Sequence, residues 1–190
     1  MYATREAWLQ DAAGELTPVI EAGGLAVPLA LRVACGFPST YRRSGALGET
    51  FTPKDSADRT VEILISPTVD SPYNVLLVLM RQLVEATALT RLNREAICAA
   101  IGLHPQKPNL YPTANTSLLD RLDAIAAALG AYPHAALSLA DRPKAATRLL
   151  KGLCPTCGYT IRLTQKWADK GMPTCPCGDT INLDTTTSEA

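Results

Sequence analysis

The sequence predicts an α+β fold, with helices around a small β-sheet, followed by a small module that carries four cysteines. Three observations predict it. Apolar residues recur at helical spacing in several long segments, short β-branched runs bounded by turn residues lie between these segments, and two close cysteine pairs occur after residue 150. A length of 190 residues fits one domain and an appendage. We expect a domain over 1–140, a linker over 141–150, the cysteine module over 151–185 and a tail over 186–190.

Composition and charge indicate a globular protein without a strong overall field. Apolar residues make up 47% of the chain and charged residues 19%, which is typical of folded proteins. The formal net charge is zero, so no whole-molecule attraction to nucleic acid or acidic lipid is expected. The charge is unevenly spread, however, because residues 142–171 carry seven basic side chains against one acidic side chain, Asp169.

The first residues do not resemble a targeting segment. They are charged and amphipathic and lack the apolar core of a signal peptide. No stretch reaches the roughly 18 apolar residues of a membrane span. We therefore expect a cytoplasmic protein without a membrane partner, in which the cysteines serve as thiols or metal ligands and do not form disulfides.

The first half of the chain alternates between helix and strand patterns. Residues 4–22 place Trp8, Leu16 and Ile20 at helical spacing. Residues 29–35 alternate as a strand does, and the polar, basic residues 39–48 predict a loop or hairpin arm. Two further strands are expected over 49–52 and 60–65, joined by a turn-rich segment.

The segment from Ser71 to Leu89 predicts a helix at the centre of the domain. Ser71 is a capping residue, and Pro72 suits the first helical position, where a missing N–H costs nothing. The apolar run from Val75 to Met80 is too continuous for a surface helix and too short to cross a bilayer. Polar residues interrupt this course at one place only: Arg81, Gln82 and Glu85. Charged groups are seldom buried without a partner, so this interruption predicts a cleft or a former site.

Two more helices and a linker complete the predicted domain. Asn93 is expected to cap a helix that ends at Gly102, and residues 117–129 predict an amphipathic helix followed by a glycine. The proline-rich residues 103–116 predict a loop, and the segment from Tyr132 to about residue 147 predicts a linker. The two histidines, His104 and His134, lie beside prolines and are expected to be surface residues.

The cysteine module carries the most specific chemical signal in the chain. The pairs are CPTCG and CPCG, and each predicts a tight turn whose glycine, Gly158 or Gly178, supplies backbone freedom. Strands are expected over 159–163 and 181–183. Four thiolates fill all positions of tetrahedral Zn²⁺, which predicts one structural zinc ion. The predicted ligands are Cys154, Cys157, Cys175 and Cys177.

The basic excess of the module points to a nucleic-acid contact. Trp167 adds an aromatic residue within the basic stretch. The competing interpretation is a solvated basic face that packs on the main domain, and the sequence does not choose between the two. The candidate contact residues are Arg148, Lys151, Arg162, Lys166 and Lys170.

The order of these parts resembles the SprT-like family. The resemblance covers nearly the whole chain and rests on ISPTVDSP before a buried helix, a further helix, YPHAALS, and a ribbon of the form CPTCGYTIR…CPCG. The chain looks especially like members from bacteriophages and bacteria. Family members have a zincin-type metalloprotease domain followed by a zinc ribbon, and the relatives called Spartan cleave proteins crosslinked to DNA. The resemblance thus implies a zincin-type domain before a zinc ribbon with four cysteine ligands.

The family's catalytic helix carries HExxH, with two histidine ligands one turn apart and a glutamate as general base. When this helix is aligned with that of the family, Arg81 occupies the position of the first histidine, Gln82 that of the glutamate and Glu85 that of the second histidine. A third histidine is expected near Thr90, but no histidine occurs between Met1 and Leu103. The resemblance therefore implies a lost catalytic zinc. Arg81 and Glu85 keep the i,i+4 spacing, and we expect them to form an ion pair in place of the metal.

These observations predict a pseudo-metalloprotease. It is expected to act by binding DNA or a protein of the nucleic-acid machinery, with the zinc ribbon as its contact module. The alternative is a phage or mobile-element effector that binds a host protein and inhibits or redirects it. A third hypothesis, an active metalloprotease that uses Glu85 with His104 or Asp70, has no support in the spacing of these residues.

Overall fold

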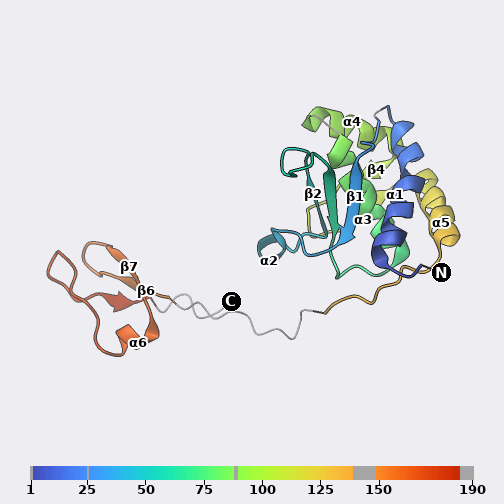
Figure 1. Ribbon diagram of the computed structural model, residues 1–190. Helices are drawn as coiled ribbons and strands as arrows, with labels where there is room; N and C mark the ends of the chain where they lie inside the picture. Colours follow the sequence, from blue (N-terminus) through green and yellow to red (C-terminus); the bar gives the residue numbers. More distant parts are fainter. Residues whose placement is uncertain (1, 25, 88–89, 139–148, 185–190) are drawn as a thin grey trace. The chain divides into compact units, whose positions relative to one another are not determined.

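The computed structural model describes residues 2–24, 26–87, 90–138 and 149–184. The chain divides into two compact units, Met1–Ser138 and Leu139–Ala190, and each is described by itself (Figure 1). Most of the linker expected over 141–150, the tail expected over 186–190 and the candidate contact residue Arg148 lie outside the described residues. Among the described helices, none combines the length and the apolar character needed to cross a membrane.

Unit 1, Met1–Ser138, is an α+β domain, as the sequence predicts. The described helices are α1 (Arg5–Glu21), the one-turn α2 (Tyr41–Ser44), α3 (Pro72–Thr87), α4 (Arg91–Ile101) and α5 (Thr116–Leu129). Its main sheet has the strand order β1-β3-β2, formed by Leu31–Cys35, Val61–Ile65 and Gly48–Phe51. Strands β1 and β3 are parallel, and β2 pairs antiparallel with β3.

The central position predicted for the helix after Ser71 is confirmed. Helix α3 begins at Pro72 and packs on β2 and β3 as well as on α1, α4 and α5 (Figure 1). The Ser71 carbonyl oxygen accepts a hydrogen bond from the Val75 N–H at 2.9 Å. The apolar run from Val75 to Met80 is buried throughout. Because α3 touches every layer of the domain, its few polar residues hold fixed positions in the fold.

Helix α1 forms for the reasons read from the sequence. The Thr4 hydroxyl accepts the Ala7 N–H at 3.2 Å and so caps the first turn. Trp8, Leu16 and Ile20 are all fully buried against the core.

Three local predictions need correction. The cap of α4 is Thr90, whose hydroxyl accepts the Asn93 N–H at 3.2 Å, so Asn93 lies inside the helix and does not begin it. The predicted loop over 39–48 contains the single turn α2, which ends at Gly45 in the left-handed region. The predicted loop over 103–116 contains a short antiparallel pair, β4 (Leu103–His104) with β5 (Thr113–Ala114).

The described part of the segment that begins at Tyr132, residues 132–138, belongs to unit 1 and not to a linker. Tyr132 is 5% exposed, and its ring packs edge-on against Trp8 with centroids 5.0 Å apart. His134 is also not a free surface residue, because Arg5 donates to its Nδ1 at 3.2 Å and its Nε2 lies 2.8 Å from the Pro67 carbonyl oxygen. Arginine can only donate, so Nδ1 accepts and the ring proton on Nε2 is donated to Pro67.

Unit 2, Leu139–Ala190, contains a small three-stranded sheet of order β7-β6-β8 and one short helix. The elements are β6 (Leu150–Leu153), β7 (Thr160–Leu163), α6 (Gln165–Ala168) and β8 (Asn182–Leu183). The expected strands over 159–163 and 181–183 are found within one residue. The central strand β6 was not predicted, and it begins at the last residue of the expected linker.

Candidate functional site

The first cysteine turn is closed by backbone hydrogen bonds. The Gly158 N–H donates to the Cys154 carbonyl oxygen at 3.1 Å, and the Cys154 N–H donates to the Tyr159 carbonyl oxygen at 2.9 Å. Gly158 has φ +74°, a conformation that side chains with a Cβ rarely adopt. The glycine is therefore required to bring Cys154 and Cys157 to the same side of the turn.

The second turn repeats this arrangement with different spacing. The Gly178 N–H donates to the Cys175 carbonyl oxygen at 2.9 Å, the Cys175 N–H donates to the Asp179 carbonyl oxygen at 2.7 Å, and Gly178 has φ +102°. The Thr156 hydroxyl donates to the Asp179 carboxylate, which joins the two turns. The shorter spacing between Cys175 and Cys177 thus still produces a turn that presents both sulfurs.

The four predicted ligands, Cys154, Cys157, Cys175 and Cys177, come together. All four sulfurs lie within 4.8 Å of one another, with Cys154 Sγ 3.5 Å from Cys177 Sγ and Cys157 Sγ 3.3 Å from Cys175 Sγ. A tetrahedron of zinc–sulfur bonds of about 2.3 Å has sulfur–sulfur edges of about 3.8 Å. The cluster can therefore hold a metal ion with every position filled by protein.

The backbone favours the thiolate form at one ligand. The N–H of Cys157, together with that of Thr156, donates to the Cys154 sulfur and lowers the pKa of Cys154 to about 7. Thiolate is the form that binds metal, so these donors favour metal binding at Cys154, whereas the pKa values of Cys175 and Cys177 are raised in the metal-free cluster, where burial and the neighbouring sulfurs outweigh their backbone donors.

The core of unit 2 is very small. Cys154, Cys175 and Ile181 are buried, and Ile161 and Met172 pack partly against them. Gly152 allows this approach, since a Cβ there would lie 2.8 Å from Ile181 and 3.0 Å from Ile161. Such a core cannot stabilise a fold alone, which agrees with a metal ion supplying folding energy.

The described basic candidates fall into two groups. The ammonium groups of Lys166 and Lys170 lie 5.9 and 5.6 Å from the centre of the Trp167 ring. Trp167 is 58% exposed. Lys151 and Arg162 are cross-strand partners on β6 and β7. Lys151 is paired with Asp184 at 2.6 Å, while Arg162 is exposed. Tyr159 is a second exposed aromatic residue, at 52% exposure, and no signal in the sequence marked it, because aromatic residues in strands are usually buried.

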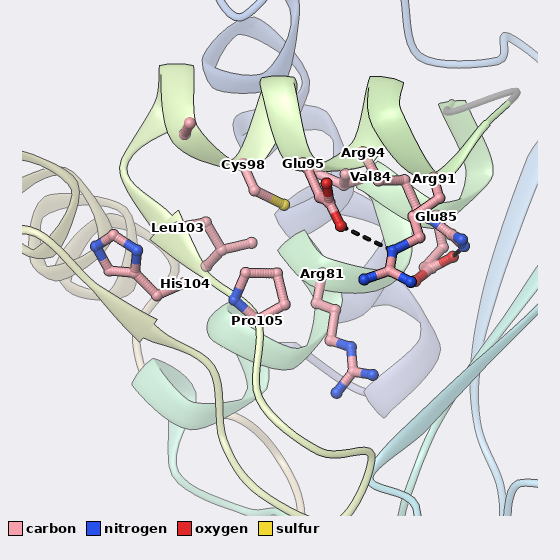
Figure 2. A pocket seen from close by; sticks show the side chains of 11 residues that line it. Arg81, Val84, Glu85, Arg91, Arg94, Glu95, Cys98, Leu103, His104 and Pro105 are labelled. Carbon is pink, nitrogen blue, oxygen red and sulfur yellow. Dashed lines mark hydrogen bonds and ion pairs between the residues drawn. The ribbon is translucent and has the colours of Figure 1, made fainter.

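In unit 1, the polar residues of α3 open onto a cleft of about 410 Å³ beside α4 and β4 (Figure 2). Arg81 and Glu85 both line it, and His104 lies on its rim as an exposed residue. A neighbouring cavity of about 340 Å³ borders β2 and is lined by Arg81, Gln82 and Glu85. The interruption of the apolar helix thus marks a cleft, as the sequence predicts.

The predicted ion pair between Arg81 and Glu85 is wrong. Glu85 pairs with Arg94 of α4, and Arg81 donates to the Lys107 carbonyl oxygen at 3.4 Å. Both side chains are partly buried in the pair, at 39% exposure for Arg94 and 34% for Glu85. Arg94 carries no local signal of this role, since the contact depends on how α4 packs on α3.

Gln82 is the most buried of the three polar positions, at 5% exposure. The Thr50 hydroxyl of β2 lies 3.0 Å from the Gln82 backbone carbonyl oxygen and 3.1 Å from its side-chain Oε1. An amide oxygen accepts hydrogen bonds but does not take up a proton near neutral pH. Gln82 therefore fixes β2 to α3 and cannot act as a general base.

Asp70, the other carboxylate considered for catalysis, accepts the Ala136 N–H at 3.3 Å. Within the described residues, the four cysteines are the only cluster of three or more histidine, cysteine or acidic side chains placed to hold a metal ion.

Comparison with known proteins identifies no relative: no family model matches the chain, and neither a curated protein nor a solved structure does.

Proposed function

We propose that the chain is an inactive SprT-like protein, a zincin-type domain that has lost its catalytic metal and is joined to a zinc ribbon. It acts by binding DNA or a protein of the nucleic-acid machinery. The observation that carries the proposal is the placement of Arg81 and Glu85, one helical turn apart on the same cleft. HExxH needs two histidines at these positions and a glutamate at Gln82.

The chemistry of these side chains opposes hydrolysis. A guanidinium does not ligate metal, the Glu85 carboxylate is engaged by Arg94, and the Gln82 amide accepts from Thr50. The three aligned positions therefore supply neither the two histidine ligands of HExxH nor its general base. Cleavage assays with casein and with a DNA–protein crosslink, each with added Zn²⁺, are expected to show no hydrolysis above buffer.

The ribbon supports a nucleic-acid contact through exposed positive charge beside an aromatic ring. Arg162, Lys166 and Lys170 are exposed, and the ammonium groups of the two lysines lie 5.9 and 5.6 Å from the centre of the Trp167 ring. Phosphate contacts supply affinity and aromatic rings accept stacked bases. Zn²⁺ is the metal that suits four thiolates. A zinc ion bound by the four cysteines holds these residues in a folded unit.

The test is DNA binding by the zinc-loaded chain, measured by fluorescence anisotropy at increasing salt. Affinity is expected to fall steeply, with a slope of log K against log salt of about −0.9 per phosphate contact. Changing Lys166 and Lys170 together to Ala should weaken binding and flatten this slope, whereas changing Lys54, an exposed lysine of unit 1, should not. Absent or salt-insensitive binding contradicts the DNA proposal.

The second candidate is an effector that binds a host protein, and the partly apolar wall of the unit 1 cleft favours it. Val84, Leu103 and Pro105 line this cleft beside the charged groups. A pull-down from a bacterial lysate with and without DNase separates the two candidates. A partner held through DNA is lost on DNase treatment, and a directly bound protein is retained.

A further inference from the structure

Arg81 is a partly buried cation whose hydrogen-bonding capacity is largely unused. In the described part of the chain no carboxylate lies within ion-pair distance of it, and its single hydrogen bond, to Lys107, is long at 3.4 Å. Burial lowers the pKa of Arg81, which reflects the cost of removing the guanidinium from water. Figure 2 shows its side chain directed away from Arg94 and Glu85, into the space below Pro105. Most of the five N–H donors of this guanidinium are therefore available to a ligand.

Gln82 adds a second donor at the same place. Its Oε1 is occupied by Thr50, but its Nε2 has no partner among the residues that the structure describes. Gly48 leaves room for this amide, since a Cβ there would lie 3.0 Å from Gln82 Nε2. Arg81 and Gln82 line one cavity together with the hydroxyl-bearing residues Thr40, Thr50 and Thr52.

One positive charge around the two cavities has no carboxylate partner among the residues that line them. Their walls carry three arginines and two glutamates, and both glutamates are already paired, Glu85 with Arg94 and Glu95 with Arg91 at 2.8 Å (Figure 2). Arg81 is the remaining cation. A single uncompensated charge fits a monoanion, and a phosphate dianion would call for more positive charge.

The shape of the donors selects among monoanions. A planar guanidinium matches a carboxylate through two parallel hydrogen bonds, and an amide N–H can complete the set. Apolar residues also line this region: Val84, Leu103 and Pro105 in the larger cleft, which Arg81 shares, and Pro108 in the cavity that Arg81 and Gln82 share. They suit a ligand whose carboxylate is attached to an apolar body.

We propose that Arg81 and Gln82 form a binding site for a carboxylate, carried by an apolar peptide at its C-terminus or on an acidic side chain. The positions aligned with a metal ligand and its general base would then bind an organic acid directly. The site lies wholly in unit 1, so it does not depend on the nucleic-acid function proposed for the ribbon.

The test uses the full-length zinc-loaded chain and calorimetric titration. The probes are a short apolar peptide with a free C-terminal carboxylate, the same peptide as a C-terminal amide, an amidated version with one internal glutamate, and inorganic phosphate. The free acid is expected to bind about tenfold or more tightly than the amide. Binding of the glutamate version assigns the site to side-chain carboxylates as well, and its failure to bind restricts the site to chain termini.

The matched variants are Arg81→Gln and Arg91→Gln. Both remove one positive charge from the same cleft, but Arg91 is exposed and already paired with Glu95. Arg81→Gln is expected to weaken binding of the carboxylate probe that binds by about 10- to 100-fold, and Arg91→Gln by about twofold or less. Arg81→Lys keeps the charge and should retain part of the affinity, which separates a local effect from misfolding.

The proposal is overturned by any of three results. One is equal binding of the free acid, the glutamate version and the plain amide, or no binding of any. Another is an equal loss in Arg81→Gln and Arg91→Gln. The third is tighter binding of inorganic phosphate than of either carboxylate peptide.

Discussion

Helix α3 and the four-cysteine ribbon of unit 2 both carry side chains at a spacing that metal ligands use, but the two sets of side chains differ in chemistry. In the ribbon, two glycine-closed turns bring four sulfurs within 4.8 Å of one another, and all four are groups that bind metal. On α3, Arg81 and Glu85 keep the one-turn spacing on a cleft, but one is a cation and the other is paired with Arg94. Spacing is thus a property of the fold, whereas metal binding depends on the side chains placed at that spacing.

The largest expected effect is the loss of the ribbon fold on removal of its metal. A structural zinc ion contributes about 10 kcal/mol or more to the folding of such a module. Changing Cys154 to Ser, or adding a strong chelator, should unfold unit 2 and leave unit 1 folded, as followed by NMR of the whole chain. Cys35→Ser is the control, since Cys35 lies in β1 of unit 1 and should not affect metal content. Unfolding of unit 1 on chelation would break the comparison.

The reciprocal change removes core volume from α3. Leu79 is fully buried, so Leu79→Ala is expected to lower the free energy of unfolding of unit 1 by about 2–5 kcal/mol. Denaturant unfolding measures this loss when both proteins also carry Trp167→Phe, so that tryptophan fluorescence reports Trp8 of unit 1 alone. The metal content of the ribbon should stay unchanged, and its loss would show that the two units fold as one.

The ion pair on α3 should contribute far less. Glu85 and Arg94 are about a third exposed, so a double-mutant cycle with Glu85→Gln and Arg94→Gln is expected to give a coupling of about 0.5–1 kcal/mol. The same cycle with Arg81→Gln in place of Arg94→Gln should give a smaller coupling. A larger coupling for Arg81 would restore the pairing first read from the sequence.

The smallest expected effect is that of acid on unit 1, and it acts through Asp58. Hydrogen bonds from Ser56 and then Arg32 hold the pKa of Asp58 well below its usual range. The folded pKa lies below the unfolded value of about 3.9, so the stabilisation is complete above about pH 5 and is lost as the pH falls further. The stability difference between the protein and its Asp58→Asn variant should therefore be present at neutral pH and shrink in acid. A difference that grows in acid would contradict this assignment.

The predictable parts of the fold are those set by neighbouring residues. Pro72 at the start of α3 and the glycines after each cysteine pair act within a few positions, and each takes its expected role. The same local logic explains the error at α4, where Thr90 and Asn93 are both good caps and the sequence alone does not rank them.

The unpredicted parts depend on contacts between distant residues. Arg94 reaches Glu85 only because α4 packs on α3, and Tyr132 is buried only because Trp8 lies beside it. Strand β6 was missed for the same reason, since its residues become a strand by pairing with β7 and β8. The cysteine cluster could be predicted although its two halves are distant in sequence, because each half is a short and recognisable motif.

The metal content of the purified chain tests the central claim most directly. Elemental analysis is predicted to find one zinc ion per chain, lost in Cys154→Ser and unchanged in Glu85→Gln. Two ions per chain, the second lost in Glu85→Gln, would show that the cleft on α3 still binds a metal and would contradict the account.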